Sequence, residues 1–350
     1  MLTVLESLNT ALLRAMQKDE RVVLIGEDIL DPYGGAFKVS RGLSSTFPER
    51  VLASPISEAG IVGLAAGMAL RGMRPVVEIM FGDFLTLAAD QLVNHIAKFR
   101  WMYNDQVRVP LVIRTPMGGR RGYGPTHSQT LEKLFLGVPG LKVVAPCALQ
   151  ADDGGMDAGQ LLLEAIADDE PVIFIENKLL YLARLQNWET LPDFDIGLIS
   201  QPADHPDAPQ SGYPTYKLTI KGAPAPILTL TAYGHMAELA REAALQLAYQ
   251  HEIFTELIVP TQLSPFAGSM QAILDSARQT KRLLVAEEGT LSLGWGAEVL
   301  ARAAESLGAG LVKSARVAAQ ETPVPAAVTL ERSALPDTGD IVRVARELCR

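Results

Sequence analysis

The chain has 350 residues, of which 48% are hydrophobic and 20% are charged, and a formal net charge of -9 at neutral pH. This length favours two domains, each large enough to bury a core of its own. Because the lysines and arginines are scattered through an acidic chain, no electrostatic footprint for nucleic acid exists. The longest strongly apolar stretch, residues 59–70, is about half of the roughly 20 residues that cross a bilayer, so we expect no membrane span.

The start of the chain and its cysteines bear on the compartment. Residues 1–16 carry an early acid and lack both a basic leader region and a small-residue cleavage site, which favours an amphipathic helix of the folded protein. Cys147 and Cys349 are too few for a disulfide framework or a zinc cluster. These features predict a cytoplasmic protein.

The first half of the chain alternates helical patterns with short apolar runs. Apolar residues recur at helical spacing over residues 7–16, and VVLIG at 22–26 then predicts the first strand. A glycine-rich loop follows, and then a helix of small residues that ends before Pro75. Further apolar runs are VVEIMF (76–81), PLVIRT (110–115), LKVVAP (141–146) and PVIFIE (171–176). Such continuous runs are typical of parallel strands buried on both faces, so residues 1–184 are predicted to form one α/β domain.

The pattern then breaks and resumes. Between residues 185 and 225 the periodicity fails, and the prolines and aspartates of QPADHPDAPQSGYP (201–214) indicate a linker. Beyond it, helical patterns alternate with the strand-like runs PILTLTAYG, FTELIVP, RLLVAEEG and GLVKSARVA. Residues 226–350 are therefore predicted to form a second, smaller α/β domain.

Several common catalytic sites are missing from the sequence. There is no G-x-S-x-G nucleophile elbow and no H-E-x-x-H or C-x-x-C zinc pattern, which disfavours simple hydrolysis. There is also no phosphate-binding G-x-x-x-x-G-K-[ST] loop and no G-x-G-x-x-G fingerprint, so a nucleotide-binding interpretation has little support.

Three short segments place polar or aromatic side chains next to predicted strand ends. SPISEAGIVGLAAGMALRG puts Glu58 at a strand-to-helix junction, where a carboxylate most often serves as a first-turn helix acid. EIMFGDF puts Met80, Phe81 and Phe84 near another strand end, where aromatic side chains are usually core. GGRRGYGPTHSQTLEKLF puts His127 in a glycine-rich loop, where exposure in a cleft is more natural than burial. Each segment alone is compatible with a structural role.

Together, and in this order, the segments resemble the β subunits of the thiamine-diphosphate-dependent 2-oxoacid dehydrogenases, the group of the pyruvate, branched-chain and acetoin decarboxylating components. The matching phrases, which span almost the whole chain, are IGEDI, YGGAFKVSRGL, PISEAGIVGLAAGMALRGMRPVVEIMFGDF, DQLVNHIAKFRWM, GYGPTHSQTLEKLFLGVPGLKVVAP, EEGTLSLGWGAEV and TPVPAA. The resemblance implies an N-terminal domain that binds the thiamine pyrimidine and a C-terminal domain like that of transketolase.

The resemblance also implies roles for individual residues. Glu58 matches the carboxylate that hydrogen-bonds a ring nitrogen of the cofactor's aminopyrimidine and so makes the cofactor its own base. Phe84 matches the aromatic position that stacks on the pyrimidine, and Ile56 and Met80 match apolar contacts around it. His127 matches the active-site histidine that faces the substrate and the incoming lipoyl group.

Two metal sites are implied, one in this chain and one outside it. A potassium-binding cluster of some members, built largely from carbonyl oxygens, is similar to four residues here: Leu111, Ala165, Ile166 and Asp168. Glu170 stands where the family often has asparagine, and the segment 152–160 is some residues longer than usual. The Gly-Asp-Gly…Asn segment that holds Mg²⁺ and the diphosphate is absent from the sequence. An α subunit is therefore expected to hold Mg²⁺, in a heterotetramer of two α and two β chains with the cofactor at the interface.

The sequence thus predicts decarboxylation of a 2-oxoacid on thiamine diphosphate and reductive acylation of a lipoyl domain carried by an acyltransferase core. A split transketolase or another carboligase shares this half of the pocket and is the second interpretation. A third interpretation is an assembly subunit that has lost turnover, against which the retained Glu58, Phe84 and His127 argue. IVPTQLSP (258–265) lacks the acid and the arginine of the family's usual phrase, so docking of the core is expected to differ. The loop before His127 differs from that of the pyruvate and branched-chain members, so the identity of the 2-oxoacid is not carried over.

Overall fold

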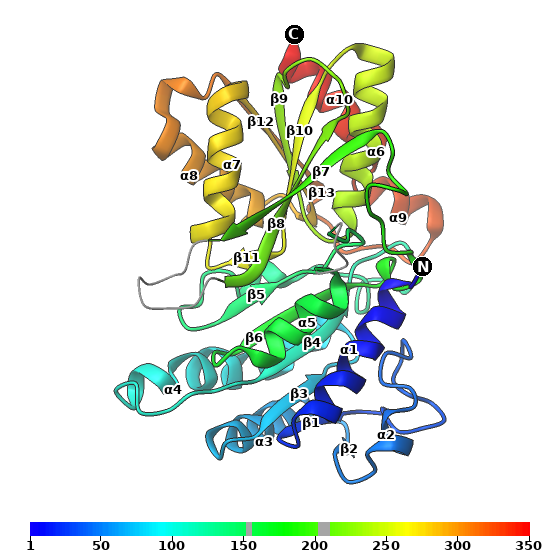
Figure 1. Ribbon diagram of the computed structural model, residues 1–350, viewed down its shortest axis with the longest axis vertical. Coiled ribbons are helices and arrows are strands. Elements are labelled where there is room, and N and C mark those ends of the chain that lie inside the picture. Colours follow the sequence, from blue (N-terminus) through cyan, green and yellow to red (C-terminus); the bar gives the residue numbers. More distant parts are fainter. Residues whose placement is uncertain (152–155, 202–210) are drawn as a thin grey trace.

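The computed structural model describes residues 1–151, 156–201 and 211–350. Part of the expected insertion (152–155) and part of the expected linker (202–210) therefore lie outside the described residues. Two α/β units, each built on one mostly parallel sheet, lie end to end along the long axis of the molecule (Figure 1). The prediction of two α/β domains is confirmed.

The described helices are α-helices and shorter segments of 3₁₀ or π type. The α-helices are α1 (Val4–Lys18), α2 (Leu43–Thr46), α3 (Glu58–Leu70), α4 (Ala97–Met102), α5 (Ala158–Ala167), α6 (His235–His251), α7 (Ala267–Thr280), α8 (Trp295–Leu307), α9 (Val328–Ala334) and α10 (Thr338–Cys349). Short 3₁₀ or π turns are η1 (Gly82–Ala88), η2 (Gln91–Ile96), η3 (Glu132–Leu134), η4 (Leu180–Leu182) and η5 (Gly308–Gly310). Within the described ranges, none of these helices is both long and apolar enough to cross a bilayer.

The first sheet has the strand order β11-β5-β6-β4-β3-β1-β2, and every neighbouring pair is parallel except β11 with β5. Its strands are β1 (Val22–Gly26), β2 (Val51–Ala53), β3 (Arg74–Glu78), β4 (Val112–Met117), β5 (Lys142–Val144), β6 (Val172–Asn177) and β11 (Gln262–Ser264). The run VVLIG coincides with β1, whereas VVEIMF extends beyond β3, which ends at Glu78. Residues 79–81 are thereby free to turn at the sheet edge.

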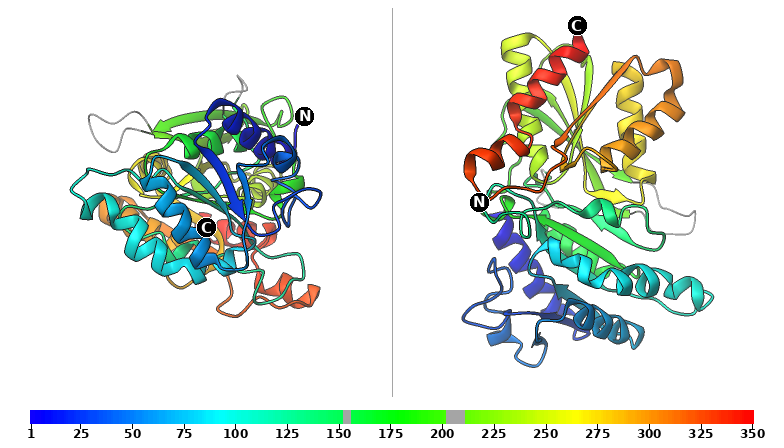
Figure 2. Two further views of the ribbon diagram at one scale, coloured as in Figure 1. Left: turned by 90° about the horizontal axis from the view of Figure 1, so that it is seen from below. Right: turned by 180° about the vertical axis from the view of Figure 1, so that it is seen from behind.

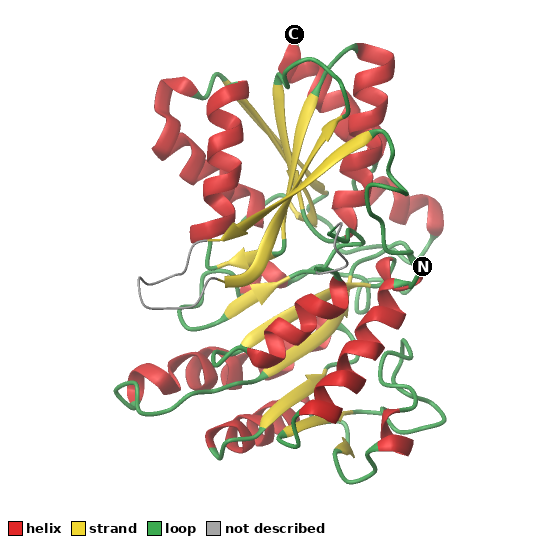
Figure 3. Cartoon of the chain, viewed as in Figure 1, coloured by secondary structure: helices red, strands yellow, loops and turns green. Residues whose placement is uncertain are grey.

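Strand β1 shows why these runs are continuously apolar. Successive side chains of a strand point to opposite faces. Val22 and Leu24 pack into the core formed with α1 and α5, while Val23 and Ile25 pack into the core formed with α3. Helices cover both faces of the sheet (Figure 3), so no position along the strand is left for a polar side chain.

The second sheet has the order β13-β12-β9-β10-β8-β7. Its strands are β7 (Phe194–Gln201), β8 (Ser211–Ile220), β9 (Leu228–Ala232), β10 (Thr255–Pro260), β12 (Arg282–Thr290) and β13 (Lys313–Ala319). The four strands from β13 to β10 are parallel, and β8 and β7 add an antiparallel pair at one edge. Helices α6 and α10 pack on one face of the parallel strands and α7 and α8 on the other.

Two strands lie where the sequence predicted a linker. β7 and β8 form an antiparallel pair, in which Phe194 lies opposite Ile220 and Ile196 opposite Leu218. The prediction of an irregular linker is therefore wrong for these two segments. The signal was present, since Tyr216, Leu218 and Ile220 alternate with polar residues as in a strand with one buried face. The prolines and aspartates around this segment favoured a linker over a strand.

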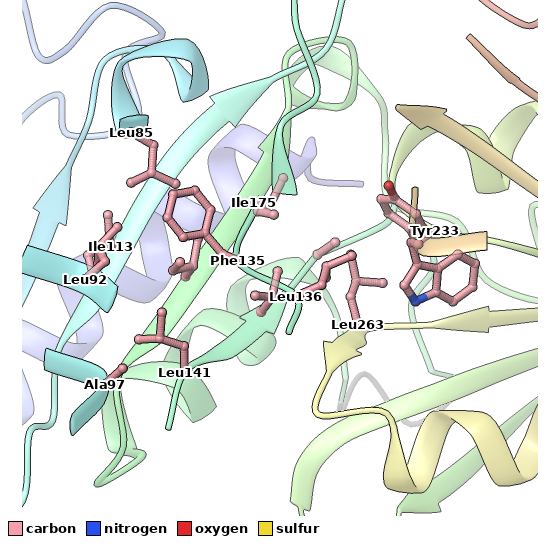
Figure 4. Close-up of a cluster of buried hydrophobic side chains, with 14 of the residues drawn as sticks. Leu85, Leu92, Ala97, Ile113, Phe135, Leu136, Leu141, Ile175, Tyr233 and Leu263 are labelled. Carbon is pink, nitrogen blue, oxygen red and sulfur yellow. The ribbon is translucent and has the colours of Figure 1, made fainter. Parts of the chain in front are cut away.

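The two units share one core. β11 follows β10 of the second sheet directly but pairs with β5 of the first. Close to this crossing, Leu263 and Tyr233 of the second unit pack into the same buried cluster as Phe135 and Leu136 of the first (Figure 4). The C-terminal unit is therefore in a position to hold loops of the N-terminal unit in place.

Candidate functional site

The carboxyl ends of β1, β2, β3, β4 and β6 meet at one edge of the first sheet. In open parallel sheets ligands bind at this edge, at the point where the strand order reverses. That point is β1, because β2 lies on one side of it and β3 on the other. Glu58 begins the helix after β2, Phe84 lies in the turn after β3, and His127 lies in the loop after β4. The sheet brings the three predicted site segments to a common edge.

Glu58 is the first residue of α3, and it is only 6% exposed. Ser57 caps this helix by accepting a hydrogen bond from the Gly60 amide at 3.3 Å, and the helix N-terminus favours a negative charge in its first turn. Glu27, the residue after β1, shares this region. Burial and the nearby charge of Glu58 raise the pKa of Glu27, and one of its carboxyl oxygens is buried with no hydrogen-bond partner in the described part of the chain. This oxygen fits a site that a polar ligand completes.

A cluster of aromatic rings surrounds Phe81, just after β3. Its ring centroid lies 4.7 Å from that of His127, 5.9 Å from that of Phe84 and 5.9 Å from that of Tyr123, each in an edge-to-face arrangement. The rings of Phe84 and His127 are themselves 5.1 Å apart. Edge-to-face contacts hold an imidazole in a defined orientation. Phe84 and His127 therefore belong to one cluster of rings around Phe81, for which the sequence predicted only a place in the core.

Polar contacts fix the same histidine. Its Nδ1 lies 2.8 Å from the hydroxyl of Thr126, so Nε2 is the ring nitrogen expected to face a ligand. Its backbone carbonyl accepts a hydrogen bond of 2.5 Å from the ammonium group of Lys178, which follows β6 and is fully buried. Burial lowers the pKa of Lys178 to about 8. Lys178 was not singled out from the sequence, although it closely follows the apolar run PVIFIE at residues 171–176.

The other predicted pocket residues lie at the same edge. Ile56 is 83% exposed in the chain by itself, and Met80 is partly buried. Asp83, in η1, accepts a hydrogen bond of 3.0 Å from the side chain of Gln129, which ties the turn after β3 to the loop that carries His127. The contacts that Ile56 and Met80 make with a cofactor stay predictions.

A buried ion cluster lies beneath this edge. Arg114 of β4 donates two hydrogen bonds to Glu176 of β6, at 2.9 and 2.5 Å, and one to Glu78 of β3. Burial and the neighbouring Glu176 raise the pKa of Glu78 despite the guanidinium beside it. Gly35 (φ +79°) lies against Glu78 so closely that a Cβ would stand 2.4 Å from its carboxylate oxygen, so the glycine-rich loop closes over the cluster.

The predicted potassium ligands lie at the opposite, amino edge of the sheet, around the end of α5 and the start of β4: Leu111, Ala165, Ile166 and Asp168. Arg74 donates from Nη1 to the carbonyl oxygens of Ile166 and Asp168, at 2.9 and 3.0 Å. The Asp168 carboxylate is paired with Lys142 at 2.8 Å, and Glu170 also faces Lys142 at 3.3 Å. Potassium binding stays a prediction, and Arg74 competes with it for two of the carbonyl oxygens.

Over the ranges that the structure describes, no group of three or more histidine, cysteine, aspartate or glutamate side chains is arranged to hold a metal ion.

Family models and known proteins match the chain over both units. Residues 1–183 match the transketolase pyrimidine binding domain, and residues 219–341 match the transketolase C-terminal domain. A solved structure described as a split-gene transketolase, an inactive β4 tetramer, superposes with a TM-score of 0.70 over 99% of this chain and 98% of its own. Its sequence identity of 19% makes this a likeness of fold alone.

Relatives in sequence are more specific. The chain is 37% identical to a mitochondrial pyruvate dehydrogenase E1 component subunit beta-2 from Oryza sativa, covering 99% of this chain and 86% of the relative. It is 34% identical to the pyruvate dehydrogenase E1 component subunit beta of Rickettsia conorii, covering 99% and 98%. It is 35% identical to the acetoin:2,6-dichlorophenolindophenol oxidoreductase subunit beta of Bacillus subtilis, covering 98% and 96%. With a transketolase-type pyrimidine-binding domain, a transketolase-type C-terminal domain and full-length relatives of this kind, the chain belongs to the family of 2-oxoacid dehydrogenase E1 β subunits.

Proposed function

We propose that the chain is the β subunit of a decarboxylating 2-oxoacid dehydrogenase component that uses thiamine diphosphate and forms its active site together with an α subunit. The observation that carries the proposal is the position of Glu58, Phe84 and His127 at one carboxyl edge, in a chain related over its whole length to such subunits. Thiamine diphosphate, when bound, supplies an acidic ring carbon and a cationic ring that takes up the electron pair released with carbon dioxide.

Glu58 would hold the pyrimidine half of the cofactor. A carboxylate at a helix N-terminus, 6% exposed, is a strong hydrogen-bond acceptor, because the low local dielectric strengthens the bond. The unpartnered oxygen of Glu27 gives a second polar contact beside it. Phe84 would offer its ring face to the pyrimidine, with Ile56 and Met80 as the apolar contacts around it.

His127 would act on the substrate side of the site. β2, which precedes Glu58, and β4, which precedes His127, are separated by three strand spacings, about 14 Å. This is the scale of a two-ring cofactor with a small substrate beside it. With Nδ1 next to Thr126, the Nε2 of His127 can hold or donate a proton as the acyl group passes to the dithiolane of a lipoyl domain.

The remaining half of the cofactor needs a second chain. We infer that an α subunit brings Mg²⁺ and the diphosphate contacts, in an assembly of two α and two β chains, and that an acyltransferase core carries the lipoyl acceptor. The absence of the Gly-Asp-Gly…Asn segment from the sequence supports this division. A split transketolase is the weaker alternative, because that likeness extends to the fold at 19% identity, whereas the sequence relatives at 34–37% are dehydrogenase subunits.

Replacing Glu58 tests the proposal. The Glu58→Gln variant, assembled with its α subunit, is expected to lose turnover of 2-oxoacids with a dye acceptor by ~10²-fold or more, because the amide cannot take part in the proton relay. Glu49→Gln, at an exposed acid of the same unit, is the matched control and keeps full turnover. Size-exclusion chromatography checks that both variants assemble. Near-normal turnover of Glu58→Gln would rule the assignment out.

A further inference from the structure

The loop that carries His127 has little structure of its own. Residues 118–131, between β4 and η3, contain neither helix nor strand. Four of its residues have positive φ: Gly118, Arg120, Gly122 and Gly124. A connection of this kind keeps one conformation only when other parts of the protein hold its backbone groups.

The C-terminal unit supplies the main anchor for the first part of this loop. Glu331, in α9, is 3% exposed and accepts hydrogen bonds from the backbone amides of Arg120 at 2.7 Å and of Gly122 at 3.1 Å. Nearby backbone amides that converge on one carboxylate, here two residues apart, form an anion-binding nest. Figure 2, seen from behind, shows α9 at the junction of the two units. The loop is thus bound to a helix more than 200 residues later in the chain.

Close packing accompanies these hydrogen bonds. A Cβ on Gly119 would stand 2.5 Å from the Leu335 side chain just after α9, and one on Gly122 would stand 3.3 Å from the carbonyl oxygen of Ala326. The side chain of Arg120 reaches the Pro336 carbonyl. The segment around α9 therefore packs closely against the loop, and a side chain at Gly119 would displace Leu335.

A second carboxylate from the same unit continues the contact. Glu288 of β12 accepts a hydrogen bond of 2.7 Å from the Gly119 amide and one of 3.0 Å from the side chain of Asn177. On the far side of the loop, Lys178 and Gln129 tie the His127 region to the N-terminal unit. The histidine is held from two units at once.

We propose that Glu331 is a positioning residue: from the C-terminal unit it binds the amides of residues 120 and 122 and so holds His127 against Phe81 and Phe84. This inference rests on the proposed function for the role of His127, but the contact itself does not depend on it. Glutamine at position 331 keeps the shape but has one acceptor oxygen, and its amide NH₂ would face the donors of the nest. The loop would then open more often.

Proteolysis tests the contact without reference to activity. Arg120 and Arg121 are trypsin sites within the loop, and trypsin cuts a segment when it opens locally. In the complex with the α subunit, Glu331→Gln is expected to be cut at these arginines about tenfold faster than the wild type. Glu305→Gln, at an exposed acid on α8, is the matched control and is cut at the wild-type rate. Equal rates for the Glu331→Gln variant and the control would overturn the proposal.

Activity tests what the contact does. Glu331→Gln should lower kcat/KM by about tenfold, and it should cause no further loss when His127→Ala is already present, because the two residues act as one unit. Faster cleavage with unchanged activity would refute the positioning of His127 by Glu331 and leave the Glu58 test of the overall function standing. An additional full loss in the His127→Ala background would also refute it. If Glu331→Gln does not assemble, Gly119→Ala, which pushes a methyl group into Leu335, disturbs the same contact.

Discussion

The two sheets have similar parallel cores but use their carboxyl edges in different ways. At the edge of the first sheet, Glu58, Phe84 and His127 lie where a ligand and a partner chain would bind, and Ile56 is left 83% exposed. The edge of the second sheet is turned inward against the first unit. There Tyr233, just after β9, donates a hydrogen bond of 2.5 Å to Glu132 at the end of the His127 loop.

The carboxyl edge of the second sheet, called the inward edge below, contains several buried acidic side chains. Glu287, next to Glu288 in β12, accepts a hydrogen bond of 3.1 Å from the Gly296 amide. Burial, together with the nearby Glu132, raises the pKa of Glu287 to about 8. Buried polar groups of this kind contribute little net stability but define one arrangement of the chain. The comparison teaches that one edge gathers the proposed site residues, while the other makes contact with the loop that carries His127.

The largest effect is expected from breaking the buried ion cluster of Arg114, Glu78 and Glu176. This cluster lies beneath the carboxyl edge of the first sheet, the open edge of the molecule. Arg114→Met would leave Glu78 and Glu176 buried and facing each other without a cation, at a cost of about 3–5 kcal/mol. The midpoint of thermal unfolding should fall by roughly 5 °C.

The exposed pair of Arg302 and Glu298 provides the control for that substitution. Arg302→Met should cost at most about 1.5 kcal/mol, because an exposed pair at this helical spacing contributes little and the contact of Arg302 with the Phe266 ring adds about 0.5–1 kcal/mol. Adding Glu78→Gln and Glu176→Gln to Arg114→Met should recover part of the loss. If Arg114→Met proved as mild as Arg302→Met, the cluster would not support the open edge.

A pH-dependent effect is expected at the inward edge. Between pH 4.5, the usual value for a glutamate, and about 8, the folded protein keeps a proton on Glu287 that the unfolded chain releases. Stability from this group is therefore complete below pH 4.5 and is lost as the pH rises through 8. The glutamine of Glu287→Gln is neutral at every pH. The free energy of unfolding of this variant, relative to that of the wild type, should therefore rise by roughly 1–2 kcal/mol between pH 6 and pH 8.

Thermal unfolding at a series of pH values measures this gain. Glu305→Gln, at an exposed acid of the same unit, should run parallel to the wild type. A constant difference between Glu287→Gln and the wild type over this range would mean that Glu287 is ionised in the folded protein.

The sequence predicted the strands and site segments at the carboxyl edge of the first sheet. It did not predict the buried contacts that hold them in place. Apolar runs buried on two faces have a signal that does not depend on distant residues, so β1, β4 and β6 were placed correctly. Glu58 and His127 were predicted as site residues because they stand in recognisable phrases next to strand ends, and their roles stay predictions. Their common edge follows from the strand order.

The supports depend on contacts between segments far apart in the chain. Nothing near Glu331 in the sequence indicates that its carboxylate binds the amides of residues 120 and 122. Arg114 likewise lies within an apolar run and gives no sign that Glu78 and Glu176 surround it. Such pairings are set by tertiary packing, which residue patterns along the chain do not contain.

The smallest effect is expected at the amino edge of the first sheet, away from both carboxyl edges. Arg74 already brings a positive charge to the carbonyl oxygens of Ile166 and Asp168, so exchanging Na⁺ for K⁺ at constant ionic strength should raise the melting temperature of the wild type by less than about 2 °C. Arg74→Gln frees these oxygens and should show a larger rise that is specific to K⁺. Arg21→Gln, at a neighbouring exposed ion pair, should show no such K⁺-specific rise. A large K⁺-specific rise in the melting temperature of the wild type would mean that the cation binds in spite of Arg74. If Arg74→Gln showed no such rise, the predicted potassium site would be eliminated, and only the carboxyl edge of the first sheet would keep a proposed ligand site.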